Sequence, residues 1–230
     1  MRSKTSRTRQ EPPKRGTVTR VSPQQATAER MNIYLDDRYA FSMSLRALGE
    51  HPVSVGDQLE ESDVARLRDA DEPDRAVASA LNLLAHRGRS ERELRQRLRM
   101  KGYTAGAIDA AIGKVVDWGY LDDERFAAAW VEQRQAGKPR SRRALANELR
   151  EKGVAREIVE TTLEEAEIDE IADAQRLAAD KWRKDEGLDP DKRRQRTAAF
   201  LARRGYGWDV ARQVLDALTR DDDTDDFKPR

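Results

Sequence analysis

The sequence contains no cysteine and only two histidines, His51 and His86, which stand in dissimilar contexts. The lack of cysteine excludes a disulfide framework and a thiolate metal site. The shortage of histidine leaves no cluster for a metal and no Ser-His-Asp arrangement. No Gly-x-Gly-x-x-Gly or Gly-x-x-x-x-Gly-Lys-Ser/Thr loop is present to bind a phosphate group. We therefore expect a protein that is not an enzyme and that holds no cofactor and no metal.

The chain is also poor in apolar residues. Hydrophobic residues make up 37% of its 230 residues and aromatic residues 6%, whereas charged residues reach 38%. An average globular domain has roughly 25% charged residues, so this composition favours several thin cores over one large core. No stretch approaches the roughly 18 apolar residues of a membrane-spanning helix, and the N-terminus lacks the apolar region of a signal peptide. We therefore expect a cytoplasmic protein with no membrane partner.

What the sequence does contain is a repeat. A Leu-x-x-Lys/Arg-Gly turn occurs three times, at Gly102, Gly153 and Gly205. A period of about fifty residues is typical of a tandem array of one supersecondary unit. From Asp74 onward the apolar spacing predicts helices only, arranged in threes, and each glycine is expected to end the second helix of its unit in the left-handed conformation.

The first unit shows the expected local chemistry. Helices are predicted over 74–86, from Ser90 to the turn at Gly102, and over 105–118. Ser90-x-x-Glu93 predicts a capping box, in which the serine hydroxyl accepts from the Glu93 amide and the Glu93 carboxylate reaches back. None of these short helices is stable alone, so packing in threes must stabilise them.

Residues 31–45 predict a β-hairpin with its turn at Asp36-Asp37. A two-stranded hairpin is marginal in water, so its apolar face is expected to dock on the first helices. A short helix is expected from Ser62, followed by a linker over 69–74 that contains a proline. The residues expected on the apolar face of the second strand are Tyr39, Phe41, Met43 and Leu45.

The residues before the hairpin predict a tail. They are rich in lysine and arginine, include Pro12-Pro13 and contain almost nothing apolar, so burial cannot offset the entropy of ordering them. Such a tail is either a basic arm on a nucleic-acid backbone or a solvated segment.

The expected fold is therefore mainly α: a tandem array of three three-helix repeats behind a small N-terminal β-hairpin. The expected parts are a basic disordered tail (1–29), the hairpin with a short helix (30–73), the three repeats (74–121, 122–168 and 169–220) and an acidic tail (221–230).

Basic residues are concentrated on the second helix of each repeat. If the repeats stack with a constant rotation, these helices form a basic stripe beside an acidic patch over 157–173, which suits a polyanion or a nucleoprotein polymer. Any single arginine is equally typical of a solvated helix face, and it is the recurrence that favours function. The candidate contacts are Arg92, Arg95, Arg99, Lys101, Arg142, Arg143, Arg150, Lys152, Arg193, Arg194, Arg203 and Arg204.

The aromatic residues are expected mainly in the small cores and at the boundaries between repeats, because they fall on apolar stripes or at unit ends. Trp208, just after a glycine turn, is the one expected to be exposed. The residues assigned to packing are Trp118, Tyr120, Phe126, Trp130, Trp182, Phe200 and Tyr206.

The motifs of the first repeat resemble those of the RecX family, the bacterial modulators of the RecA recombinase. The similarity covers about 74–218, is most specific at Trp118-Gly119-Tyr120-Leu121-Asp122-Asp123-x-x-Phe126, and is weakest in the third repeat. The residues of the structural motif are Gly102, Tyr103, Trp118, Gly119, Tyr120, Leu121, Asp122, Asp123, Phe126, Gly153 and Gly205.

The resemblance implies a non-enzymatic regulator built as an elongated curved rod. Similar proteins bind the RecA nucleoprotein filament, lie in its helical groove and suppress its ATPase, strand-exchange and co-protease activities. Some of them bind DNA. We therefore expect RecA and non-specific single- and double-stranded DNA as partners of a monomer.

Two alternatives belong to other classes. The three-helix units could act as helix-turn-helix readers, making the protein a regulator that acts on duplex DNA with sequence specificity. The array could also be a helical scaffold for a different protein. Selection on random duplexes separates the first alternative from a filament modulator.

Overall fold

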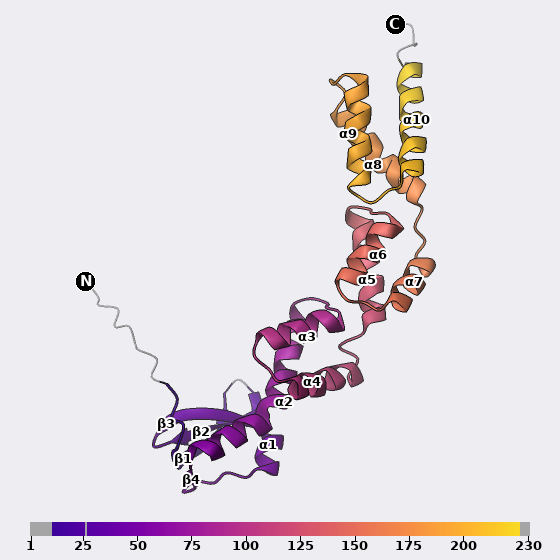
Figure 1. Ribbon diagram of the computed structural model, residues 1–230. Helices are drawn as coiled ribbons and strands as arrows, with labels where there is room; N and C mark the ends of the chain where they lie inside the picture. The colour runs from indigo at the N-terminus through magenta and orange to yellow at the C-terminus, as the bar shows by residue number, and fades with distance from the viewer. Residues whose placement is uncertain (1–10, 26, 226–230) are drawn as a thin grey trace, which may run out of the picture. The chain divides into compact units, whose positions relative to one another are not determined.

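The computed structural model describes residues 11–25 and 27–225 of the chain. The chain forms two compact units, one extending to His86 and including Arg95–Tyr120, the other comprising Arg87–Leu94 and the residues from Leu121 onward. The described residues form a small antiparallel sheet followed by helices (Figure 1). The mainly α-helical class, the N-terminal strands and the three three-helix units are confirmed.

The sheet has four strands in the order β3-β2-β1-β4. Asp36 and Asp37 connect β2 to β3 with positive φ angles of 47° and 62°, as a two-residue type I′ hairpin turn requires. The predicted hairpin and its turn are therefore confirmed. The strands are β1 (Gly16–Gln24), β2 (Thr27–Leu35), β3 (Arg38–Ser44) and β4 (Gln58–Leu59).

The prediction of which residues form the apolar face of the second strand is partly wrong. Phe41 and Met43 are buried, but Tyr39 is 48% exposed and Leu45 51% exposed. The pairing of β2 with β3 slips between Ile33 and the next residue, so Ala40 forms a bulge. Because a bulge reverses the alternation of faces, Ala40 enters the core and Tyr39 turns outward.

The expected tail over 1–29 is wrong from residue 16 onward. β1 pairs with β2 along most of its length, and Val18 is 1% exposed in the core of the sheet. Arg20 is not a free cation in this region, because its guanidinium lies 3.8 Å from the centre of the Tyr34 ring. Pairing with the neighbouring strand β2 and with the distant strand β4 orders this polar strand, which its composition alone does not reveal. The tail expected over residues 1–10 lies outside the described residues.

The expected linker over 69–74 is also wrong. After α1 (Leu45–Glu50), α2 runs without interruption over Glu61–His86 and contains Pro73. A proline inside a helix costs about 3 kcal/mol, and the contacts around it explain why the helix persists. Asp71 is fully buried and accepts hydrogen bonds from the Arg30 guanidinium at 2.6 Å and from the Ser44 amide at 2.7 Å.

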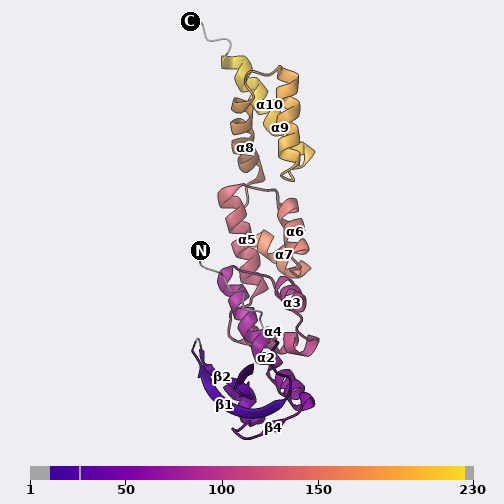
Figure 2. The same cartoon turned by 90° about the vertical axis from the view of Figure 1, so that its left-hand side faces the viewer.

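The two halves of α2 belong to different packing environments. Val64 and Leu67 lie in the core of the sheet, whereas Ala76, Val77 and Ala80 are buried on the half that packs against α4. Figures 1 and 2 show α2 passing from the sheet to α4. The N-terminal sheet and the first repeat therefore share one continuous helix, which the hydrophobic spacing did not predict.

The remaining helices follow the predicted threes. Gly102, Gly153 and Gly205 have φ angles of 85°, 84° and 89°, the left-handed conformation that ends a helix most readily at glycine. The helices are α3 (Glu91–Met100), α4 (Ala105–Asp117), α5 (Asp123–Gly137), α6 (Arg142–Glu151), α7 (Arg156–Glu165), α8 (Glu170–Lys184), α9 (Pro190–Ala202) and α10 (Trp208–Asp225).

The second and third repeats each close a thin core of their own. Leu145 and Leu149 are fully buried in the second repeat, and Leu201 and Val214 in the third, where α8, α9 and α10 pack on one another (Figure 2). The expected acidic tail is helical over 221–225, since no proline or glycine interrupts α10. The rest of the expected acidic tail, residues 226–230, lies outside the described part of the chain.

Candidate nucleic-acid and filament interface

The second helices of the first two repeats carry the same exposed face. In α3 it consists of Arg92, Gln96 and Arg99. In α6 the same positions relative to the glycine turn hold Arg143, Asn147 and Arg150. All six side chains are exposed. Spacings of four and seven residues place them on one side of each helix, with the two arginines roughly 10 Å apart along the axis.

Buried leucines orient these faces. Leu94 and Leu98 in α3, and Leu145 and Leu149 in α6, are all fully buried. Because the leucines anchor one side of each helix in the core, the arginines that flank them face solvent. Arg150 donates to Asn147 Oδ1 at 3.2 Å, so the amide also holds an arginine in place. We call Arg92-Gln96-Arg99 and Arg143-Asn147-Arg150 the two arginine faces.

The third repeat lacks this face. Its matching positions are Gln195, Ala199 and Ala202. The candidates Arg193 and Arg194 pack within the repeat, where Arg193 Nε donates to the Trp182 carbonyl at 3.0 Å and Arg194 pairs with Asp216 at 2.5 Å. Of the candidates in α9 and the turn after it, Arg203 is exposed.

Arg142 has a structural role. Its guanidinium donates to the carbonyl oxygens of Leu163, Ala166 and Ile168, the last two at 3.1 Å and 3.4 Å. These carbonyls lie at the end of α7 and just beyond it, where a helix leaves backbone acceptors without partners. Arg142 therefore stabilises the second repeat, whereas its neighbour Arg143 faces solvent.

The basic residue before each glycine is used in packing rather than left exposed to a ligand. Lys101 Nζ donates to Ser79 Oγ at 2.9 Å. Lys152 Nζ pairs with Glu93 at 3.2 Å and lies 4.2 Å from the centre of the Trp130 ring.

Arg204 and Arg95 also form contacts within the protein. Arg204 donates to the Pro139 carbonyl at 3.4 Å and lies over Phe200, and burial together with the nearby Arg140 lowers the pKa of its guanidinium. Arg95 pairs with Asp109 at 2.5 Å. Of the twelve candidates, the structure brings together Arg92 with Arg99 and Arg143 with Arg150.

A contact that was not predicted from the sequence joins the second helix of one repeat to the glycine turn of the next repeat. The Ser90 hydroxyl donates to the Lys152 carbonyl, and the Ser141 amide donates to the Arg204 carbonyl at 3.2 Å. Both serines are N-caps, and both are buried. The serine at the start of one second helix therefore holds the glycine turn of the next repeat.

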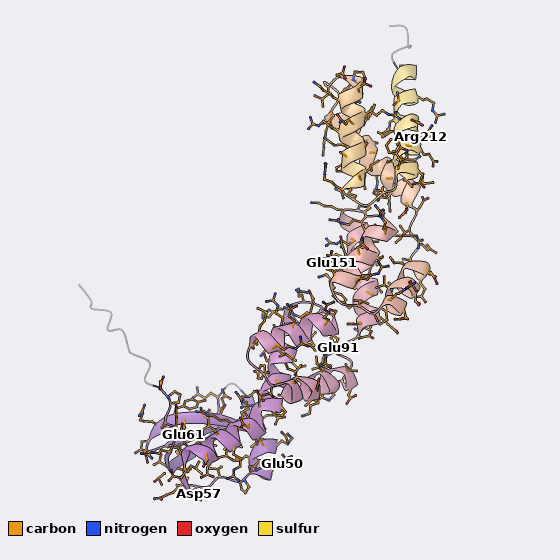
Figure 3. All side chains as sticks on the ribbon, viewed as in Figure 1. Glu50, Asp57, Glu61, Glu91, Glu151 and Arg212 are labelled. Carbon is orange, nitrogen blue, oxygen red and sulfur yellow. The ribbon has the colours of Figure 1, made fainter. Side chains whose placement is uncertain are left out.

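A second pair of contacts repeats at the same place. The Glu91 amide donates to Asp123 Oδ1 at 2.8 Å, and the Arg142 amide donates to Glu170 Oε1 at 2.5 Å; Figure 3 marks Glu91 at the start of α3. Burial raises the pKa of Asp123, although the hydrogen bond from Glu91 opposes this shift. We call the serine and carboxylate contacts together the seam. Its sequence signal is a serine before α3 and before α6, with an acid at the start of the repeat that follows.

The capping box at Ser90 is only half formed. Ser90 Oγ accepts from the Glu93 amide at 3.2 Å as predicted. The Glu93 carboxylate instead accepts from Arg87 at 2.9 Å and from Lys152 at 3.2 Å. Two cations compete with the backbone amide for this carboxylate, which local spacing could not reveal.

The seam explains a difference among the three glycines. A Cβ on Gly153 would lie 2.0 Å from Arg92 Cδ, and one on Gly205 would lie 2.5 Å from Ser141 Oγ, whereas one on Gly102 meets nothing within 4 Å. Gly102 is therefore required only by its backbone conformation. Gly153 and Gly205 also leave room for the neighbouring helix.

Two aromatic residues expected inside lie at the surface. Trp118 is 52% exposed and Tyr120 63% exposed, and their rings meet edge to face at 6.5 Å. Gly119, with φ 71°, turns the chain so that only Leu121 of this run enters a core. Trp208, expected at the surface, is 72% exposed, and the packing of Trp182 and Tyr206 is confirmed.

The fold defines an α-helical tandem-repeat protein with a small β-sheet domain before its repeats. Among the described residues, no helix is long and apolar enough to cross a membrane. Models of four RecX domains match the chain: the RecX N-terminal domain at residues 16–60, and the first, second and third three-helix domains at 76–114, 122–163 and 168–215.

The chain belongs to the RecX family of regulatory proteins. Regulatory protein RecX of Bacillus subtilis (strain 168) is 30% identical over 212 residues, covering 92% of this chain and 80% of the relative. That of Listeria innocua serovar 6a is 30% identical over 210 residues, covering 91% and 78%. These relatives carry the name of regulatory proteins, not of enzymes.

Solved structures share the fold. A crystal structure of regulatory protein RecX superposes with a TM-score of 0.65 at 22% identity, covering 87% of this chain and 98% of that one. RecX from Lactobacillus salivarius superposes with a TM-score of 0.57 at 19% identity, covering 65% and 98%.

Proposed function

We propose that this protein binds the RecA nucleoprotein filament and inhibits its ATPase, strand-exchange and co-protease activities. Membership of the RecX family, with matches from the N-terminal sheet through the third repeat, is the observation that carries the proposal. The protein acts by binding, as a monomer and without a cofactor.

The two arginine faces support a contact with the nucleic acid of the filament. A guanidinium group binds phosphate oxygens in a bidentate manner. Each face carries two of them roughly 10 Å apart, and a nucleic-acid strand presents a phosphate every ~3.4 Å along its axis. One helix can therefore reach more than one phosphate. The contact is weak and independent of sequence, as phosphate contacts are.

The test is the single-stranded-DNA-dependent ATPase of the RecA-type recombinase from the same organism, measured while this protein is titrated. Inhibition far below one molecule per recombinase subunit supports action at filament ends or by disassembly. Inhibition that needs near-equal amounts supports occupation of the filament groove. No effect at any ratio, with circular dichroism showing a folded helical protein, would refute the proposal.

One observation favours a second candidate, a reader of duplex DNA. Gln96 and Asn147 are exposed between the arginines of the two faces, and such amides can bind adenine in a bidentate manner in the major groove. Selection from a pool of random duplexes tests this candidate directly. An enriched sequence supports it, and a pool that stays random after several rounds excludes it.

A further inference from the structure

A groove lies between α5 and α7 of the second repeat, and the segment that follows α7 closes one side. Its volume is about 730 Å³. Its floor is apolar, because Val131, Ile158 and Ile168 line it and belong to the repeat's core or pack against it. The groove is formed entirely by residues of one compact unit.

Carboxylates surround this apolar floor. A single basic residue, Arg125, stands among the lining residues. The acidic side chains are all exposed, and within the described ranges none of them forms an ion pair or a side-chain hydrogen bond. They are Glu124, Glu132, Glu157, Glu165 and Glu167.

Other acids of the same unit are neutralised by the protein itself. Glu148 accepts from Arg134 at 2.8 Å and pairs with Arg140 at 2.9 Å, and Asp185 pairs with Lys181 at 2.7 Å. Among the described residues the glutamates of the groove form no such ion pairs, although Arg156 lies near Glu157, so net negative charge remains around an apolar surface. A ligand with positive charges and aliphatic groups reduces the repulsion among the glutamates and also covers the exposed apolar surface.

We propose that the α5–α7 groove binds a segment of a partner protein in which aliphatic side chains are flanked by lysine or arginine. The aliphatic side chains cover Val131, Ile158 and Ile168, and the cations meet the five glutamates. This is the pattern by which grooves between helices bind amphipathic segments. The inference rests on the groove alone and is independent of the arginine faces.

Charge and apolarity together select this occupant. A nucleic-acid strand carries the wrong charge. The chain's own N-terminal tail carries the right charge, but it has no apolar side chain between Arg2 and Gln10, so it leaves the floor of the groove uncovered.

Binding can be measured with the full chain and a labelled synthetic peptide in which leucines at helical spacing alternate with lysines. Fluorescence anisotropy is expected to show saturable binding of this peptide. Two matched peptides, one with serine in place of leucine and one with glutamate in place of lysine, are expected not to bind. Equal binding of the serine peptide overturns the proposal, because charge attraction alone then explains the result.

Two pairs of variants locate the site. Glu165→Lys is expected to weaken the peptide roughly fivefold, whereas Glu164→Lys, next to it on α7 and outside the lining, leaves the affinity unchanged. Ala128→Trp, at an exposed position of α5, fills the groove and is expected to weaken binding of the peptide. Ala129→Trp, at a neighbouring exposed position outside the lining, is the control and is expected to leave the affinity unchanged.

Either of two results rejects the assignment. Equal effects within both pairs of variants show that the peptide binds elsewhere. Tighter binding of a peptide of residues 1–15 than of the lysine-leucine peptide assigns the groove to the chain's own tail instead of a partner. Recombinase ATPase is measured on the same variants, so a failure here is distinguishable from a failure of the proposed function.

Discussion

The Ser90 hydroxyl donates a hydrogen bond to the carbonyl oxygen of Lys152, 62 residues further along the chain, while Ser90 Oγ itself accepts from the Glu93 amide. One side chain therefore caps α3 and holds the glycine turn of the second repeat. Ser90 itself is fully buried.

Ser90→Ala is expected to destabilise the protein by about 1–3 kcal/mol, because it removes an N-cap and leaves the half-buried Lys152 carbonyl without its donor. The measurement is urea unfolding followed by circular dichroism. Ser62→Ala, at an exposed position of α2, is the matched control and is expected to change stability by less than about 0.5 kcal/mol. Equal effects of the two substitutions would contradict a role for the seam.

Gly153→Ala is expected to cost more than Gly102→Ala. Both substitutions place an alanine in the left-handed region, at about 1–2 kcal/mol, but only Gly153 lies against Arg92. Overpacking adds about 1–3 kcal/mol. A double-mutant cycle with Arg92→Gly measures this interaction, because Arg92 Cβ itself would lie 2.5 Å from the added Cβ and only removal of the whole side chain relieves the contact. Equal destabilisation at the two glycines would show that Arg92 moves aside freely.

Substitution of two neighbouring arginines of α6 is expected to have different effects, one on stability and the other on binding. Arg142→Ala removes a charged donor from three carbonyls near the end of α7 and should lower the unfolding free energy by about 1.5–3 kcal/mol. Arg143→Ala, at an exposed position, should leave stability unchanged and weaken binding to DNA and filament. Urea unfolding and DNA anisotropy on both variants check this, and a lower unfolding free energy for Arg143→Ala would contradict it.

The triple variant Arg99→Gln, Arg143→Gln, Arg150→Gln is expected to inhibit the recombinase ATPase less and to bind DNA less tightly. Affinity for duplex should fall with salt, and the log–log slope should become shallower by roughly 0.9 for each phosphate that the variant no longer binds. The control removes the same charge at exposed sites elsewhere, with Gln at Arg176, Arg183 and Arg212; Arg212 is marked in Figure 3. An unchanged slope in the first variant would remove the arginine faces as the DNA-binding surface.

Stability should also depend on the protonation of Glu93. Burial pushes the pKa of this carboxyl upward, but its bonds to Arg87 and Lys152 outweigh burial and hold the pKa below the usual 4.5. The unfolded chain then binds the proton more tightly than the folded one. The contribution of Glu93 to the free energy of unfolding is therefore present above pH 4.5 and is lost as the pH falls through the pKa of the folded state.

The urea midpoint of Glu93→Gln should accordingly vary less with pH across this window than that of the wild type. Glu151→Gln, an exposed acid near the end of α6 (Figure 3), is the control and should follow the wild-type curve. Parallel curves for wild type and Glu93→Gln would show that Glu93 adds no proton-linked stability.

Much of the helical part of the fold was predictable because its signals are local. The glycine turns, the cap at Ser90 and the leucine stripe of each second helix depend on residues within a few positions of one another. The hairpin turn at Asp36-Asp37 was predictable for the same reason. The strand β1 was not, because its polar sequence is ordered by pairing with β2 and β4.

The candidate site was predictable as a set of basic residues but not as a surface. Arg142 and Arg143 are indistinguishable in sequence, and only the position of the end of α7 decides which of them is held by the protein and which faces solvent. Arg95, Lys101 and Lys152 looked equally available, yet acids and a serine elsewhere in the fold engage them.

The sequence by itself therefore determined the three-helix repeats, their glycine turns and the concentration of charge on the second helices, since helix periodicity and capping act over a few residues. Only the tertiary structure decided that α2 continues through Pro73, that Ser90 and Ser141 hold the next repeat, and that the glutamates beside α5 and α7 surround an apolar groove. Those features depend on which distant atoms come within hydrogen-bonding or packing distance, and local spacing carries no information about that.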